Sequence, residues 1–138
     1  MVLLGGTAGI GLATARAAAE LGAAVVVASS RKSSADSALA VLPSNAEGRV
    51  LDLRDEAAIT AFFAGIGPFD HLVFTAGESL FVGPLGTTDI GVARAFFEIR
   101  FWAAVTSVKH AAPLLRPGGS ITLTSGGTVE RPAPGWTV

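Results

Sequence analysis

The chain has 138 residues, of which half are hydrophobic and 15% are charged, and its formal net charge at pH 7 is −1. This composition is typical of one folded domain with a sizeable core, and it excludes a largely disordered chain. The near-neutral charge gives no reason to expect a nucleic-acid partner or an anionic membrane.

The sequence contains no cysteine and only two histidines, which are far apart. Disulfides and thiolate-bound metals are therefore excluded, and we expect no metal site. No apolar stretch is long enough to span a membrane, and the four glycines between residues 5 and 11 would break the helix of a signal peptide. We expect a soluble, cytoplasmic protein without a membrane partner.

Short apolar runs alternate with longer helical segments, a pattern that predicts βαβ units and a parallel sheet. In chain order we expect a strand at residues 2–4, a helix at 12–21, a strand at 24–28, a short helix capped by Ser33 or Ser34 that ends before Pro43, a strand at 49–53, a helix at 55–64, a strand at 71–74, a helical stretch at about 88–112 and a strand at 120–124. The fold class is thus α/β with a doubly wound parallel sheet. The last dozen residues are rich in Gly and Pro, and we expect them to form a loop.

The long stretch at 88–112 carries apolar side chains over more than one narrow stripe. They are Phe96, Phe97, Ile99, Phe101, Trp102, Val105 and Val108. One side of such a helix could pack on the sheet and another on a neighbouring element or a second subunit. A single wide stripe that faces the core explains the pattern equally well.

The most informative feature is the junction of the first strand and the first helix, where Gly5, Gly9 and Gly11 follow an apolar run. A strand, a glycine turn and a helix place the helix N-terminus and free backbone N–H groups against a phosphate. Glycine is expected because a β-carbon would obstruct the tight turn and the close approach of the ligand. The alternative is a flexible loop between two core elements, but the βα context favours nucleotide binding.

The spacing in residues 5–11 is Gly-x-x-x-Gly-x-Gly, and this segment resembles the cofactor signature Thr-Gly-x-x-x-Gly-Ile-Gly of the short-chain dehydrogenases/reductases. Residues 51–53 resemble the end of that family's third strand, residues 69–77 its fourth-strand motif ending in Asn-Ala-Gly, and residues 118–121 the start of its fifth strand. The resemblance covers essentially the whole chain. It implies a Rossmann-like, three-layer α/β/α fold with the strand order 3-2-1-4-5.

The resemblance also implies a single NAD(P)-binding domain over residues 1–138 that is incomplete at its C-terminus, in the loop after strand five. The family continues with further strands beyond this point. A fifth strand at the edge of the sheet would be open to pairing with another chain. We therefore expect a homo-oligomer.

The matching motifs imply a cofactor site built from four segments. The glycine turn would hold the phosphates, the residues after the second strand would face the ribose, the third strand would end beside adenine, and the fourth would line the crevice. The candidate cofactor-binding residues are Gly5, Thr7, Gly9, Ile10, Gly11, Ser29, Ser30, Arg31, Lys32, Asp52, Leu53, Thr75, Ala76 and Gly77.

The end of the second strand indicates which dinucleotide is bound. NAD-binding enzymes usually place an acidic residue there to accept hydrogen bonds from the ribose hydroxyls. This chain has Ser29-Ser30-Arg31-Lys32 instead, with no acid and two adjacent cations that would hold a 2′-phosphate. We expect NADP(H) to be preferred over NAD(H). The alternative is that the two cations form a solvated loop pair.

Several positions depart from the family pattern. Leu4 replaces the Thr before the first glycine, Thr75 replaces the Asn of Asn-Ala-Gly, and Arg100 falls where the family has a catalytic Asn. The family's catalytic Ser aligns with Gly126, and a one-residue slip would bring Ser125 into that role. The sequence contains no tyrosine, so the Tyr-x-x-x-Lys pair that supplies the family's proton donor and ribose-binding lysine is absent.

Three further side chains could take part in chemistry. Arg100 is either a surface residue whose stem covers apolar side chains or a residue that faces the active-site end of its helix. His71 and His110 could act as acid–base groups, but their places at a strand start and near a helix end favour structural roles.

The resemblance implies an NADP(H)-dependent oxidoreductase that transfers a hydride between nicotinamide and an alcohol or carbonyl substrate, with Ser125 as the candidate catalytic residue. Proton transfer and oxyanion stabilisation are each worth about 10²–10⁴-fold in rate, so without Tyr and Lys we expect a weak catalyst at best. Two alternatives stay open: a dinucleotide-binding module without turnover, and a fragment of a longer enzyme.

Overall fold

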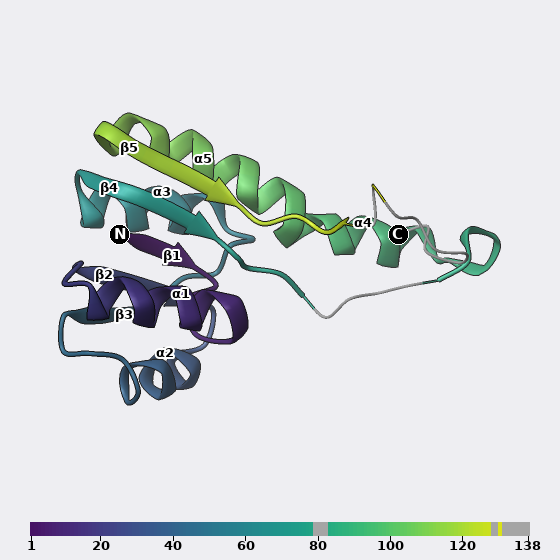
Figure 1. Ribbon diagram of the computed structural model, residues 1–138. Coiled ribbons are helices and arrows are strands. Elements are labelled where there is room, and N and C mark those ends of the chain that lie inside the picture. The colour runs from purple at the N-terminus through teal and green to yellow at the C-terminus, as the bar shows by residue number, and fades with distance from the viewer. Residues whose placement is uncertain (79–82, 128–129, 131–138) are drawn as a thin grey trace.

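Five parallel strands form one sheet in the computed structural model, which describes residues 1–78, 83–127 and 130 (Figure 1). The strands are β1 (Val2–Leu4), β2 (Val25–Ser29), β3 (Ala46–Val50), β4 (Phe69–Phe74) and β5 (Leu115–Leu123). Their order in the sheet is β3-β2-β1-β4-β5, and every neighbouring pair is parallel. The predicted fold class and strand order are confirmed.

Helices cover both faces of the sheet, which gives the predicted three layers (Figure 1). The helical segments are α1 (Gly9–Glu20), α2 (Lys32–Leu39), α3 (Glu56–Ile66), the 3₁₀ turn η1 (Leu85–Thr87), α4 (Ile90–Phe97), the π-helical η2 (Glu98–Ala103), α5 (Ala104–Ala111) and the 3₁₀ turn η3 (Ala112–Leu114). Helices α1 and α2 pack on one face, whereas α3, η2 and α5 pack on the other. None of the helices in the described part of the chain is long and apolar enough to cross a membrane.

The central strand β1 shows how side chains are sorted between the two faces. Val2 and Leu4 join the core beneath α3 and α5, whereas Leu3 joins the core beneath α1 and α2. This alternation follows from the period of two along a strand. All three side chains are at most 1% exposed. The end of β1, where the glycine turn begins, is therefore anchored from both sides.

Helix α3 begins where the sequence predicts, because Asp55 caps it. The Asp55 carboxylate accepts hydrogen bonds from the backbone N–H of Ala57 at 2.8 Å and of Ala58 at 3.2 Å. These bonds satisfy two of the N–H groups that a helix leaves unpaired at its start. Gly67, with φ of +71°, ends the helix in a conformation that favours glycine.

The predicted position of the third strand is wrong by three residues. β3 spans Ala46–Val50 rather than residues 49–53, because its register with β2 pairs Val25 with Ala46 and Ser29 with Val50. An edge strand needs no continuous apolar run, so the apolar residues that follow β3 gave a misleading signal. Residues 51–53 lie beyond the strand instead, at the carboxyl edge of the sheet.

The fifth strand is longer than predicted. β5 spans Leu115–Leu123 and so begins before the predicted strand at residues 120–124. Leu115 pairs with Phe69 and Ser120 pairs with His71, and an irregularity in the ladder takes up the extra residues between them. Gly118 has φ of +83° within this irregular segment, as expected of a glycine in a β-bulge.

The predicted cap of the second helix is also wrong. Helix α2 begins at Lys32 and has Arg31 at its N-cap position, with no side-chain cap hydrogen bond. Ser33 and Ser34 lie inside the first turn. The helix ends at Leu39 and so stops before Pro43, as predicted.

The long helical stretch is present but is not one regular α-helix. It consists of α4, the π-helical η2 and α5 in succession, with η2 carrying Arg100. A π-helical insertion rotates the residues that follow it relative to those before, and such insertions are frequent at functional sites. The predicted loop over the last dozen residues lies largely outside the described residues, and the single-domain boundary at 1–138 stays a prediction.

Candidate functional site

A pocket of about 380 Å³ opens at the carboxyl edge of the sheet. It is lined by the ends of four strands and the segments that follow them. The lining residues are Gly5, Thr7, Ala8, Ala28, Ser29, Ser30, Arg31, Leu51, Asp52, Leu53, Arg54, Thr75, Ala76, Gly77, Glu78 and Ile99. In open α/β sheets this edge is where ligands bind, at the point where the strand order reverses on either side of β1.

The glycine turn packs directly against the end of β4. Gly5 has φ of +87°, and a β-carbon there would lie 2.5 Å from the backbone nitrogen of Ala76. A β-carbon at Gly11 would collide with the carbonyl oxygen of Gly5 and with the hydroxyl of Thr75. These two glycines are therefore required for the approach of one protein segment to another. The sequence analysis had instead explained these glycines by the close approach of the ligand.

Thr75 stabilises this turn from the β4 side. Its hydroxyl donates to the carbonyl oxygen of Gly5 at 3.1 Å, and its backbone N–H donates to the carbonyl oxygen of Leu4 at 2.8 Å. The side chain that replaces the family's Asn is thus used within the protein. Thr75 lines the pocket while it fixes the position of the glycine turn.

The N-terminus of α1 has the features of a phosphate site. Its N-cap residue, Ala8, has no side chain that could accept a hydrogen bond from the first turn. Gly9 has φ of +51° with open space where a β-carbon would lie, and Ile10 is 73% exposed. The first backbone N–H groups of the helix are therefore free of a side-chain cap and available to an anion. Thr7 and Ala8 line the pocket, whereas Gly9, Ile10 and Gly11 follow them in the chain and are not part of the lining.

The two cations after β2 have different surroundings. Arg31 lines the pocket together with Ser29 and Ser30, and no ion pair of its guanidinium is found in the described part of the chain. The Nζ of Lys32 lies 2.7 Å from a carboxylate oxygen of Asp36, one turn further along α2. Lys32 is not part of the pocket lining. The structure therefore brings one of the two predicted cations to the site.

The segment after β3 supplies the next wall of the pocket. Leu51 is buried, and Asp52 and Leu53 follow it at the pocket surface, as the sequence predicts. The Asp52 carboxylate accepts a hydrogen bond from the backbone N–H of Arg54 at 3.0 Å. This bond fixes the turn between β3 and α3, and it leaves the second carboxylate oxygen of Asp52 for a ligand.

The guanidinium of Arg100 is directed at the segment after β4, which favours the second of its two alternatives. Its guanidinium lies 4.9 Å from the centre of the Phe96 ring and packs against Gly77. One Nη donates to the carbonyl oxygen of Glu78. The Nε of Arg100 is buried and has no hydrogen-bond partner among the residues that the structure describes.

Sequence reasoning missed Arg54 and Glu78, whose side chains form an ion pair at the pocket. Neither residue belongs to a family motif. Two charged residues that follow separate strands gave a usable signal, because the carboxyl ends of parallel strands meet at one edge of the sheet.

Ser125 lies beyond the end of β5 and is exposed. The preceding Thr124 is anchored by its backbone N–H and its hydroxyl to the carbonyl oxygen of Phe74, at 3.1 and 3.0 Å. Ser125 therefore sits at the carboxyl edge of the sheet but outside the lining of the pocket. Its catalytic role stays a prediction.

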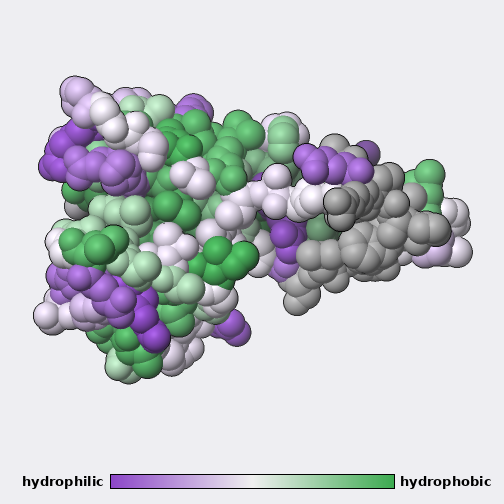
Figure 2. All heavy atoms as spheres, viewed as in Figure 1, coloured by the Kyte–Doolittle hydropathy of each residue, from purple (hydrophilic) through white to green (hydrophobic). Residues whose placement is uncertain are grey.

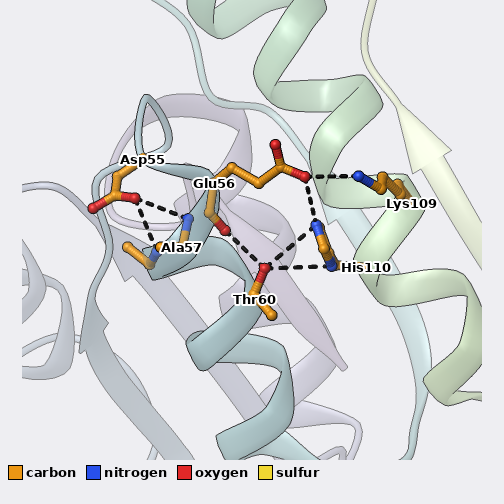
Figure 3. Close-up of polar contacts among 7 residues, drawn as sticks. Asp55, Glu56, Ala57, Thr60, Lys109 and His110 are labelled. Atoms are coloured by element: carbon orange, nitrogen blue, oxygen red, sulfur yellow. Dashed lines mark hydrogen bonds and ion pairs between the residues drawn. The ribbon is translucent and has the colours of Figure 1, made fainter.

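Both histidines make contacts away from the pocket. The Nδ1 of His71 lies 3.0 Å from the hydroxyl of Ser120, across β4 and β5. His110 and Lys109 of α5 reach Glu56 of α3 at 3.0 and 2.8 Å (Figure 3). Hydrogen bonds from Lys109 and His110 lower the pKa of the Glu56 carboxyl. This cluster connects α3 to α5.

Within the described ranges, no group of acidic or histidine side chains could hold a metal ion.

The chain matches a known family over its whole length. A family model described as an SDR-like Rossmann domain covers residues 1–138, where SDR stands for short-chain dehydrogenase/reductase. The chain belongs to the SDR family. Short-chain dehydrogenase/reductase ucsE of an Acremonium species is 36% identical to it over 152 residues, a match that covers 96% of this chain and 58% of that protein.

Solved SDR structures share the fold. The MalC reductase/Diels–Alderase from Malbranchea aurantiaca superposes with a TM-score of 0.84 at 30% identity, over 98% of this chain and 59% of that one. A small-chain dehydrogenase in complex with NADPH superposes with a TM-score of 0.72 at 33% identity, over 97% and 53%. The chain thus spans between 53% and 59% of the length of these SDR relatives.

Proposed function

We propose that this chain is the cofactor-binding part of an NADP(H)-dependent oxidoreductase that acts on an alcohol or carbonyl substrate. The observation that carries the proposal is the pocket itself. It joins the uncapped N-terminus of α1, an arginine without an ion pair in the described part of the chain, and an aspartate with a free carboxylate oxygen. Diphosphate, 2′-phosphate and adenine would find complementary groups there.

The preference for NADP(H) rests on the end of β2. The residues that line the pocket there are Ser29, Ser30 and Arg31, and none is acidic. A guanidinium binds a phosphate through charge-assisted hydrogen bonds, whereas an acidic residue at this place would repel it. The 33%-identical relative in complex with NADPH is consistent with this preference. Arg31 would hold the 2′-phosphate, and Lys32 would contribute at most a long-range electrostatic attraction.

When bound, the nicotinamide supplies or accepts the hydride, and the chain's own residues bind and orient the cofactor. The glycine turn and α1 would fix the diphosphate, and Ala76 and Gly77 would support the cofactor by close backbone approach. Ser125 would hydrogen-bond the reacting oxygen of the substrate from the edge of the sheet.

A binding map tests the proposed function. NADPH added to isotope-labelled protein should shift the amide resonances of Gly9, Arg31 and Asp52, and leave those of His71 and Ser120 in place. Arg31 and Asp52 line the pocket and Gly9 follows Ala8 of its lining, whereas His71 and Ser120 pair between β4 and β5, outside the lining. Shifts confined to residues of this β4–β5 pairing, or no shifts at saturating NADPH, would contradict the assignment.

We also propose that the chain self-associates through β5. Among the described strands β5 pairs with β4 alone, and Leu123 at its end is 51% exposed. The space-filling view shows hydrophobic surface over the region of β4 and β5 (Figure 2). Open strand edges favour pairing between chains.

A cytoplasmic location stays a prediction from the absence of cysteine.

A further inference from the structure

Glu78 is held from two sides by arginines of different elements. Its carboxylate forms an ion pair with Arg54, which follows β3. Its backbone carbonyl oxygen accepts a hydrogen bond from Arg100 in η2. Arg54, Gly77 and Glu78 all line the pocket. Glu78, in the segment that follows β4, is therefore connected both to the segment after β3 and to the helical layer.

The contact between Arg54 and Glu78 crosses the ligand pocket. β3 and β4 are not neighbours, because β2 and β1 lie between them. With strands about 4.8 Å apart, β3 and β4 are separated by about 14 Å. The two side chains must therefore meet above the carboxyl ends of β2 and β1. That is where the glycine turn and Ser29 contribute to the pocket.

The burial of Arg100 has an energetic cost that its visible contacts offset only in part. Its Nε is buried without a partner in the described residues, and a buried unpaired donor is destabilising. The ring of Phe96 and the carbonyl of Glu78 offset this cost. A buried polar group without a partner calls for an explanation, and a role at the site that it borders is one such explanation.

We propose that Glu78 is a positioning residue of the dinucleotide pocket, and that Arg54 and Arg100 hold it so that the backbone at Gly77 and Glu78 is preformed for the cofactor. This inference rests on the proposed function. The side chains of Arg54 and Glu78 are 53% and 33% exposed, so the ion pair contributes little to global stability. The ion pair instead keeps the pocket wall in one conformation. A preformed wall increases affinity because less ordering is required on binding.

The proposal predicts a change in dinucleotide affinity that is opposite in direction to the change expected from charge repulsion alone. Glu78→Gln removes a negative charge from the lining of a pocket that would bind a polyanion, so Coulomb repulsion alone predicts tighter binding. Loss of the positioning contact predicts weaker binding. Both NADPH and NADH should lose affinity to the same extent, because the pocket wall faces the part that the two molecules share.

The test is a double-mutant cycle of NADPH and NADH dissociation constants for the wild type, E78Q, R54Q and the double variant. Each single variant should weaken binding of both dinucleotides about three- to tenfold, and the double variant should lose no more than either single one. The control is R116Q, which breaks an Arg116–Asp70 pair of similar exposure at the start of β4 and should leave both constants unchanged. Thermal melts report whether each variant is folded.

The outcomes separate this inference from the proposed function. If the wild type binds NADPH and E78Q binds it as tightly or more tightly, the positioning role is wrong while the proposed function stands. Additive losses in the double variant would likewise overturn the inference, because Arg54 would then contact the ligand by itself. A wild type that binds neither dinucleotide would remove the basis of both. R54Q changes an exposed side chain and tests the same contact if E78Q does not fold.

Discussion

Arg31 and Lys32 are adjacent cations, yet their positions give them different roles. Arg31 lines the pocket, and Lys32 is turned towards Asp36, with a distance of 2.7 Å between charged atoms. A pair at positions i and i+4 of a helix is geometrically favoured, so the first turn of α2 draws Lys32 away from the site. At the scale of single residues, the proposed selectivity for a 2′-phosphate would therefore depend on one side chain.

Replacing Arg31 should lower the affinity for NADPH and leave the affinity for NADH nearly unchanged. Arg31→Gln removes a charge-assisted contact worth about 1.5–3 kcal/mol, which corresponds to about a ten- to hundredfold weaker NADPH complex. Calorimetric titration of both dinucleotides measures this. Lys32→Gln is the matched control, with an expected loss below about threefold because Lys32 is already paired. Equal losses for the two variants would show that Arg31 has no special role.

The sequence motifs located most of the site but could not resolve such differences. The positions of Asp52, Ala76 and Gly77 at the pocket follow from the motif order, since the carboxyl ends of parallel strands share one edge. The different surroundings of Arg31 and Lys32 depend on where α2 begins, and the sequence placed that start incorrectly. Side-chain contacts between segments that are distant in the sequence can be identified only from the tertiary structure.

At the scale of elements, the junction of β1 and α1 is held by packing of glycines against β4. Gly11→Ala places a β-carbon against the carbonyl oxygen of Gly5 and the hydroxyl of Thr75, so the turn or the end of β4 must move. We expect a loss of about 1–3 kcal/mol in the free energy of unfolding, typical of overpacking. Chemical denaturation measures it.

The control for this prediction is Gly65→Ala in α3, where nothing lies within 4 Å of the new β-carbon. Alanine is the better helix former by about 0.5–1 kcal/mol, so this variant should be neutral or slightly more stable. If Gly11→Ala were as stable as Gly65→Ala, the close contact between the glycine turn and β4 would be refuted.

The contact between α3 and α5 should make stability depend on acid pH. Lys109 and His110 lower the pKa of Glu56 from its ordinary value of 4.5 (Figure 3). A carboxyl whose pKa is lower in the folded state stabilises the fold above its unfolded-state pKa. That contribution is lost as the pH falls through the folded-state pKa.

Glu56→Gln should therefore lower stability near neutral pH and flatten the stability profile below pH 4.5 relative to the wild type. The measurement is urea unfolding of both proteins between about pH 7 and about pH 3. Glu47→Gln is a suitable control, because Glu47 pairs with Arg49 within β3 and joins no two elements. Parallel profiles for the wild type and Glu56→Gln would contradict the predicted linkage.

Element boundaries were predicted well where an element is buried or capped by its own residues. The apolar run of β1 and the start of α3 depend on local residues, and both were located from the sequence, whereas the cap that Asp55 provides was identified only in the structure. β3 was misplaced because it is an edge strand whose position is set by its register with β2. The π-helical η2 was not expected, since the apolar pattern of residues 88–112 has no feature that distinguishes it from a regular helix.

At the scale of the whole molecule, the proposed pairing along β5 predicts association between chains. If the chain self-associates through β5 as proposed, the mass from light scattering should rise with protein concentration and exceed that of one chain. Replacing Leu123 by Lys should reduce the effect, since a charge at an exposed strand end disfavours pairing. A single-chain mass at all concentrations would contradict this.

The central claim is that the pocket at the carboxyl edge binds a dinucleotide and selects the 2′-phosphate. The most direct test is a calorimetric titration of the purified chain with NADPH and, in parallel, with NADH. We predict saturable binding of both with one site per chain, and an NADPH dissociation constant lower by about tenfold or more. Equal affinities would contradict the role of Arg31, and the absence of binding would show that these residues do not form a dinucleotide site in the isolated chain.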